Sequence, residues 1–158
     1  MSQLLGYTAP ISAEQLATLK SSGYLPDDLI GKTGLESTYE EELRGTYGSE
    51  SVERDASGRR LQVLQTVSEP KAGDSLTLTI DTKAQKDAEK ALRWAMGEVG
   101  IKRGTVIAMN PQTGEILAMV SLPTYDNNQF ARGISNKEYQ KLLTNPDKPL
   151  INHATQAW

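Results

Sequence analysis

Apolar and polar residues along this chain follow two different periods, which predicts short helices separated by β-hairpins. A capping box, Ser12-Ala13-Glu14-Gln15, opens a predicted helix over residues 12–21, and Gly23 supplies its stop. A second short helix is predicted over residues 35–43 and ends at Gly45. Turn-forming residues 55–58 separate two extended runs and indicate a β-hairpin.

The second half of the chain has longer periodic segments. Leu76, Leu78 and Ile80 alternate with polar residues, which predicts a half-buried strand over residues 76–80. The longest predicted helix follows, with Thr82 as its cap and Gln85 as the reciprocal partner. Its apolar stripe consists of Ala84, Ala88, Ala91, Leu92, Ala95, Met96 and Val99.

Two apolar runs come next, over residues 105–109 and 116–120, and flank a turn at residues 110–114. They predict a hairpin that is buried on both faces. Beyond Pro123 the chain reads as irregular surface, with one short helix around residues 135–143. Helices and antiparallel strands without βαβ alternation place the chain in the α+β class.

A linker-like stretch, residues 70–74, predicts a domain boundary near residue 73. Residues 1–73 carry 7 basic and 11 acidic side chains, a net −4, whereas residues 74–158 carry 10 and 9, a net +1. The two parts therefore differ in character as well as in pattern.

Composition removes several classes of function from the 158-residue chain. Its net charge of −3 leaves no basic excess for nucleic-acid phosphates. The chain has no cysteine and one histidine, His153, which removes disulfides, thiol nucleophiles and histidine-rich metal sites. We find neither a signal peptide nor 18 consecutive apolar residues, so the chain as given is expected to be soluble.

Two short motifs match catalytic elements but lack their context. Gly31-Lys32-Thr33 would need a glycine at position 26 to be a phosphate-binding loop, and Pro26 stands there. Lys32-Thr33-Gly34 and Ser68-Glu69-Pro70-Lys71 spell two elements of β-lactam-reactive serine acyltransferases. Pro70 disfavours the helical turn that would hold the lysine against Ser68, and the two elements occur in the wrong order.

The remaining candidates favour structural roles. Asp27-Asp28 and Glu40-Glu41-Glu42 are expected to be caps and solvated helix faces. His153 is expected to be a surface or core histidine, and Trp94 and Trp158 are expected to pack or to lie at an interface. We therefore assign no catalytic, cofactor-binding or metal-binding residue.

Several separate blocks of the sequence match one known family, in the family's own order. The first blocks are residues 31–36, Tyr39, Leu43-Arg44-Gly45 and residues 55–59, and they resemble the noncatalytic module of class B penicillin-binding proteins. Residues 76–81, with Gln85 in the expected place, resemble the opening of the transpeptidase domain, and residues 104–119 resemble its first hairpin. The agreement continues through Pro123, Tyr125-Asp126 and Asn128, and runs from about Leu4 to Asn152. Thr33 and His153 depart from the family's usual Ser and Arg.

The resemblance implies a noncatalytic pedestal segment over residues 1–73 and the start of a transpeptidase domain of the serine β-lactamase-like kind over residues 74–158. The parent protein would be a penicillin-binding D,D-transpeptidase that cross-links peptidoglycan during cell-wall synthesis. It would serve cell division or cell shape. It would be anchored in the cytoplasmic membrane, with this region outside it. The family's Ser-x-x-Lys nucleophile lies a short step beyond Asn152, so the chain is expected to be an inactive internal fragment.

The expected partners are the missing C-terminal portion of the transpeptidase domain or a second copy of the chain. Other cell-wall synthesis proteins are possible partners of the parent, and nucleic acid is not. No cofactor is implied. An alternative from another class is a stand-alone α+β binding or assembly module without enzyme activity.

Overall fold

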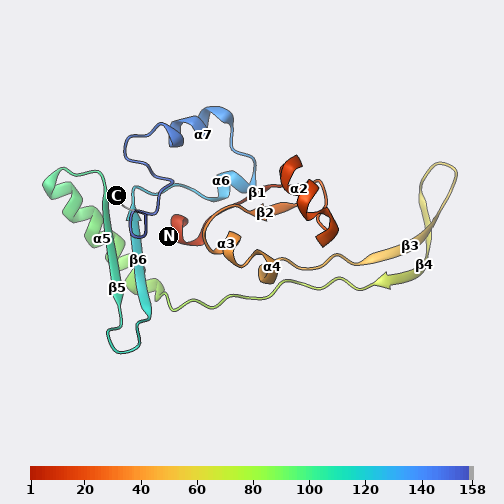
Figure 1. Ribbon diagram of the computed structural model, residues 1–158, viewed down its shortest axis with the longest axis horizontal. Helices are drawn as coiled ribbons and strands as arrows, with labels where there is room; N and C mark the ends of the chain where they lie inside the picture. Colours follow the sequence, from red (N-terminus) through yellow and green to blue (C-terminus); the bar gives the residue numbers. More distant parts are fainter. Residues whose placement is uncertain (157–158) are drawn as a thin grey trace. The chain divides into compact units, whose positions relative to one another are not determined.

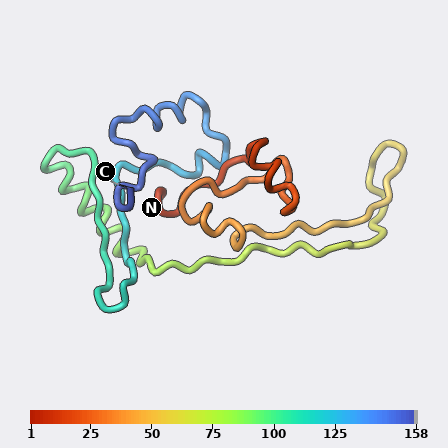
Figure 2. The backbone as a smooth tube through the Cα atoms, in the orientation of Figure 1, coloured from red at the N-terminus to blue at the C-terminus, as the bar shows by residue number. Residues whose placement is uncertain are grey.

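The computed structural model describes residues 1–156 and forms two compact units that interleave along the sequence (Figure 1). Unit 1 contains Met1–Pro10, Leu29–Thr38 and the chain from Thr77 onward, and unit 2 contains Ile11–Asp28 and Tyr39–Leu76. Figure 2 follows the backbone as it crosses between the units. The boundary expected near residue 73 is a division between family modules, and it stays a prediction.

Unit 1 begins with a short helix and a small two-stranded sheet. Helix α1 (Ser2–Leu5) precedes β1 (Thr8–Pro10), which pairs antiparallel with β2 (Leu29–Gly31). Helix α3 (Gly34–Thr38) follows β2 and contacts α1. The 35–43 helix of the sequence prediction is therefore only partly correct, because Tyr39 leaves the helical conformation and a separate helix begins in unit 2.

The rest of unit 1 is built on helix α5 (Thr82–Val99) and the antiparallel hairpin β5 (Gly104–Met109) and β6 (Ile116–Leu122). Helices α6 (Asn128–Ala131) and α7 (Asn136–Leu143) follow. Ser135 caps α7 by accepting a hydrogen bond from Glu138 N, which confirms the predicted helix there. Figure 1 shows α6 next to β1.

Two details of α5 differ from the sequence prediction. Asp81, and not Thr82, caps the helix, because its carboxylate accepts a hydrogen bond from Ala84 N. The predicted stripe is also wider than the contact surface: Ala84, Ala88, Leu92 and Met96 are half-buried, while Ala91, Ala95 and Val99 are exposed. A helix that rests on only two strands covers a single row of side chains, and this limits its buried face.

The predicted strand over residues 76–80 does not form. Among the described residues, its hydrogen bond to β6 runs from Thr79 Oγ1 to Ile116 O, and Asp81 N just beyond it donates to Leu117 O, so no continuous ladder forms. The expectation of two-sided burial for the β5–β6 hairpin is also wrong, because Ile107 and Met109 of β5 are about half exposed. The core of unit 1 instead lies along β6, where Ala118, Val120 and Leu122 are almost fully buried.

Unit 2 contains the elements that the sequence predicts most closely. Helix α2 (Ala13–Leu19) has the predicted capping box between Ser12 and Gln15, and a 3₁₀ turn, η1 (Lys20–Ser22), ends at Gly23 in the left-handed conformation. Helix α4 (Glu40–Leu43) is one turn long. Strands β3 (Ser49–Arg54) and β4 (Arg60–Ser68) form the predicted hairpin. Together with unit 1, these elements confirm the α+β class.

Candidate functional site

The two acyltransferase-like motifs fall in different compact units: Lys32-Thr33-Gly34 belongs to unit 1, and Ser68 and Lys71 belong to unit 2. Ser68 ends β4, where its hydroxyl accepts a hydrogen bond from Ser49 N and lies 3.0 Å from Ser49 Oγ. Lys71 pairs through its backbone with Thr46 in an isolated bridge. The chain between Ser68 and Lys71 is therefore extended. A Ser-x-x-Lys nucleophile needs a helical turn, which would bring the lysine against the serine, and that turn is not formed here.

The Gly31–Gly34 segment instead makes a close backbone crossing. Gly34 has φ +62°, and a Cβ there would lie 2.6 Å from Gly6 N and from Leu4 O. Gly6, at φ +84°, would collide with the Thr33 carbonyl in the same way. Only glycine fits both conditions, so this motif joins the N-terminal segment to α3.

Buried polar side chains attach this N-terminal segment to the second half of the chain. Gln3 is 8% exposed, and its Nε2 donates to Pro123 O at 2.8 Å and to Pro149 O at 2.9 Å. Asn127 Nδ2 donates to Gly6 O at 2.9 Å. Ser2 Oγ donates to Tyr125 O at 2.6 Å. These bonds connect residues more than 110 positions apart and satisfy backbone carbonyls that have left regular structure.

An aromatic cluster packs on the same junction. The rings of Tyr7 and Phe130 stack with centroids 3.9 Å apart, and Tyr125 meets Phe130 edge-on at 5.5 Å. Phe130 is 3% exposed. Burial raises the pKa of both the Tyr7 and the Tyr125 phenol, so these groups stay neutral near pH 7. We call the contacts of Ser2, Gln3, Gly6 and Tyr7 with residues 123–130 and 149, together with the crossing of Gly6 and Gly34, the N-terminal junction.

A second buried amide holds α5 on the hairpin. Gln85 is 2% exposed; its Nε2 donates to Met119 O at 2.9 Å, and its Oε1 accepts from Met119 N at 2.8 Å. The side chain thus hydrogen-bonds to β6 as a neighbouring strand would. This role replaces the capping role that the sequence predicted for Gln85.

Unit 2 has its own polar centre around Asp28 and Arg44. Arg44 donates to Ser22 O and Gly23 O, stacks 3.5 Å from the centroid of the Tyr24 ring, and lies 3.7 Å from Asp28 Oδ2. Burial raises the pKa of Asp28, but hydrogen bonds from Tyr47 and Leu25 N, together with Arg44, outweigh it and hold the pKa below its usual value. The expectation that Asp28 is a helix cap or part of a solvated helix face is therefore wrong, because its buried carboxylate belongs to this network and caps no helix among the described residues.

The other residues singled out in the sequence have simple environments. Glu40 accepts a hydrogen bond from Tyr24 at 3.1 Å. The backbone N–H of His153 donates to Ser121 Oγ at 3.0 Å, and its ring Nε2 lies 3.2 Å from Asp147 O. Trp94 is 70% exposed on α5, and Trp158 lies outside the described residues. Within residues 1–156, no group of three or more metal-ligating side chains gathers.

Sequence reasoning missed the junction residues Gln3 and Asn127, since an isolated amide has no periodic signal. Gln85 did have one, because it is a polar residue next to the apolar stripe of a long helix. A polar side chain at such a position has to find a partner when it is buried.

No helix in residues 1–156 combines the length and apolar character needed to cross a bilayer.

Comparison with known proteins matches this arrangement to two family models. The penicillin-binding protein dimerisation domain matches residues 1–78, and the penicillin-binding protein transpeptidase domain matches residues 104–157. The N-terminal junction thus connects the start of the first match to part of the second. All of unit 2, including the β3–β4 hairpin, lies within the first match.

Individual relatives agree with the family models. The chain is 38% identical over 160 residues to the peptidoglycan D,D-transpeptidase MrdA of Escherichia coli strain K12, covering 99% of this chain and 24% of that protein. A structure described as a peptidoglycan synthase complex that coordinates polymerization and crosslinking matches with a TM-score of 0.82 and 34% identity, over 97% of this chain and 28% of that one.

A third match is the Helicobacter pylori complex of penicillin-binding protein PBP2 with MreC, at a TM-score of 0.76 and 32% identity, over 96% of this chain and 26% of that one. The chain spans about a quarter of the length of these relatives. The two domain matches, the relatives that cover nearly all of this chain, and the shared fold agree. The chain belongs to the class B penicillin-binding proteins, in which it comprises a dimerisation-domain segment followed by a transpeptidase-domain segment.

Proposed function

We propose that this chain is the coupling region of a peptidoglycan D,D-transpeptidase, in which a noncatalytic pedestal holds and orients the transpeptidase domain. The N-terminal junction carries the proposal, because residues of the dimerisation match fold into one compact unit with the transpeptidase segment. Gln3, Asn127 and the glycine crossing fix this attachment with buried hydrogen bonds and backbone contact. Two family modules that share one core transmit orientation better than modules joined by a linker.

The reaction of the whole protein, on this proposal, is acylation of a serine by a peptidoglycan stem peptide with release of D-alanine, followed by transfer to an amine of a second peptide. The chain itself contributes positioning and no reacting group. The whole protein would be anchored in the cytoplasmic membrane and would present this region outside it. Support for partner proteins comes from the related PBP2–MreC complex and the related synthase complex.

We expect the rest of the transpeptidase domain to pack on the exposed residues of β5 and α5. Ile107, Met109, Trp94 and Val99 are about half to two-thirds exposed there, and apolar surface of this kind marks an interaction site. The β5 strand also has a free edge in the described sheet, since β6 is its one partner there. A second copy of the chain is the competing occupant when the remainder is absent.

Penicillin acylation of the longer protein that contains this chain tests the coupling role. We expect the double variant Gln3→Ala/Asn127→Ala to lower the second-order rate constant of acylation by about tenfold or more, because the junction no longer fixes the transpeptidase segment. The control Arg59→Ala/Arg60→Ala removes two exposed side chains of the β3–β4 hairpin and should leave the rate unchanged.

An unchanged rate in a stably folded double variant would refute coupling, and a longer protein that no penicillin acylates would favour the stand-alone binding module. Intact mass of the 158-residue chain after incubation with penicillin gives a second readout. We expect no adduct. An adduct that disappears in Ser68→Ala would make Ser68 a nucleophile and contradict the noncatalytic role.

A further inference from the structure

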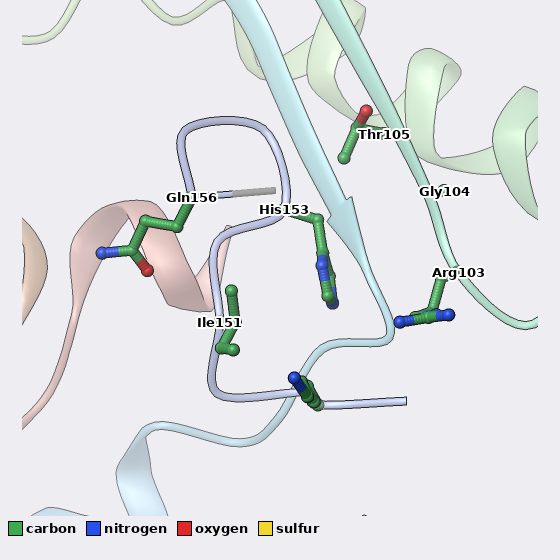
Figure 3. A pocket seen from close by; sticks show the side chains of 7 residues that line it. Arg103, Gly104, Thr105, Ile151, His153 and Gln156 are labelled. Atoms are coloured by element: carbon green, nitrogen blue, oxygen red, sulfur yellow. The ribbon is translucent and has the colours of Figure 1, made fainter. Parts of the chain in front are cut away.

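A pocket of about 330 Å³ lies in unit 1 between the start of β5 and the chain after α7 (Figure 3). Two of the residues that line it are cations, Arg103 and Lys148, and the others include the side chains of His153, Thr105 and Gln156. Among the described residues, no carboxylate lines this pocket. A cationic pocket is unexpected in a chain with a net charge of −3.

The two cations are available to a ligand. Arg103 and Lys148 are exposed, and neither belongs to the ion pairs found within residues 1–156. Figure 3 shows Arg103 at one side of the pocket and His153 at the other. Arginine presents a planar fork of donors that matches the oxygens of a carboxylate or phosphate, and lysine adds a point charge.

The backbone supports this arrangement on the side of residues 147–153. Lys148 has φ +48°, the one non-glycine residue in the left-handed region among the described residues. Ile151 N donates to Lys148 O, and the His153 ring is held by Asp147 O on one side. The loop therefore fixes the backbone at Lys148 and places the His153 ring at the pocket.

We propose that this pocket binds an anionic group with two or more acceptor oxygens, a carboxylate or a phosphate, through Arg103 and Lys148. The neutral Gln156 amide and the apolar Ile151 side chain limit its size. The site goes beyond the coupling role, since it uses none of the junction residues. Small solutes carry such groups, and so do the side chains of other protein segments. The site recognises the anionic group that both sources share.

Titration of the ¹⁵N-labelled chain with inorganic phosphate and, separately, with malonate tests the site at constant ionic strength made up with chloride. We expect saturable amide shifts at Arg103, Thr105, Lys148, His153 and Gln156 with at least one of the two anions. Saturation by phosphate alone identifies a phosphate ligand, and saturation by malonate alone identifies a carboxylate. Both assignments support the site.

The double variant Arg103→Gln/Lys148→Asn should weaken binding by at least tenfold, and asparagine tolerates the left-handed backbone at position 148. The matched control Arg132→Gln/Lys137→Gln removes the same charge from exposed positions around α7 and should bind as the unaltered chain does. Shifts that stay linear in both anions, or equal loss of affinity in the two double variants, would overturn the proposal and indicate general charge screening.

Discussion

At the scale of single residues, glycine and buried polar side chains decide how this chain is held together. Gly34 is the sharpest case, because its positive φ and the nearby backbone of Leu4 and Gly6 leave no room for a methyl group. The same residue belongs to a motif that, in sequence, matched a catalytic Lys-Thr-Gly element. The structure explains its glycines by backbone crossing and not by catalysis.

Gly34→Ala is expected to destabilise the chain by more than about 2 kcal/mol, since strain at positive φ adds to the collision with Gly6 N and Leu4 O. Urea unfolding followed by circular dichroism measures the change. Gly97→Ala is the matched control, because a Cβ there meets open space within α5, and it should stabilise the chain by about 0.5–1 kcal/mol. Equal effects of the two substitutions would contradict the crossing.

Acid should loosen unit 2 through Asp28. The pKa of Asp28 lies below its usual value in the folded chain, so its ionised form contributes stability above the unfolded pKa of about 3.9. That stability is lost as the pH falls from there through the lower folded pKa. Hydrogen exchange at pH 5 and at pH 3 should show a loss of protection around Asp28 and Arg44, and Asp28→Asn should reduce the difference. A loss that is equal in both proteins would assign the acid effect to other groups.

At the scale of elements, the sequence predicted the parts of the fold that carry local signals. The capping box of α2, the turn at residues 55–58 and helix α7 lie where the pattern placed them, because each depends on neighbours in sequence. The strand expected over residues 76–80 failed for the opposite reason. Its alternation is present, and Leu78 and Ile80 are half-buried, but a strand also needs a continuous partner, which no local pattern supplies.

Burial of α5 followed the same division between local and non-local information. The helix was predictable from spacing, whereas the choice of the row Ala84, Ala88, Leu92 and Met96 as the contact face depends on the hairpin beneath it. The candidate site shows this more strongly. Gln3 and Asn127 bond to carbonyls over 100 residues away, and nothing near them in sequence identifies their partners.

Gln85→Ala should destabilise unit 1 by about 2–3 kcal/mol, because it leaves the N–H and C=O of Met119 without the partner that replaces a strand. Thermal unfolding followed by far-ultraviolet circular dichroism, which reports the loss of helix, measures the change. Gln140→Ala, at an exposed position of α7, is the control and should change stability by less than about 0.5 kcal/mol. A Gln85 variant as stable as this control would show that the amide does not hold α5 on β6.

At the scale of the whole molecule, the compact units and the family modules do not coincide. Residues 1–10 and 29–38 match the dimerisation domain, yet they pack with the transpeptidase segment, while the remainder of that match forms unit 2. The N-terminal junction is therefore where one module continues into the core of the other. Sequence resemblance identified both modules in order, but it could not show that their segments share a core.

Hydrogen–deuterium exchange of the 158-residue chain and of Gln3→Ala/Asn127→Ala tests the shared core most directly. The account predicts that residues 1–10, 29–38 and 116–130 lose protection together in the variant, while α2 and the β3–β4 hairpin keep theirs. If residues 29–38 instead exchange in step with residues 11–28 and 39–76, and independently of residues 116–130, the dimerisation segment has its own core and the coupling role is wrong.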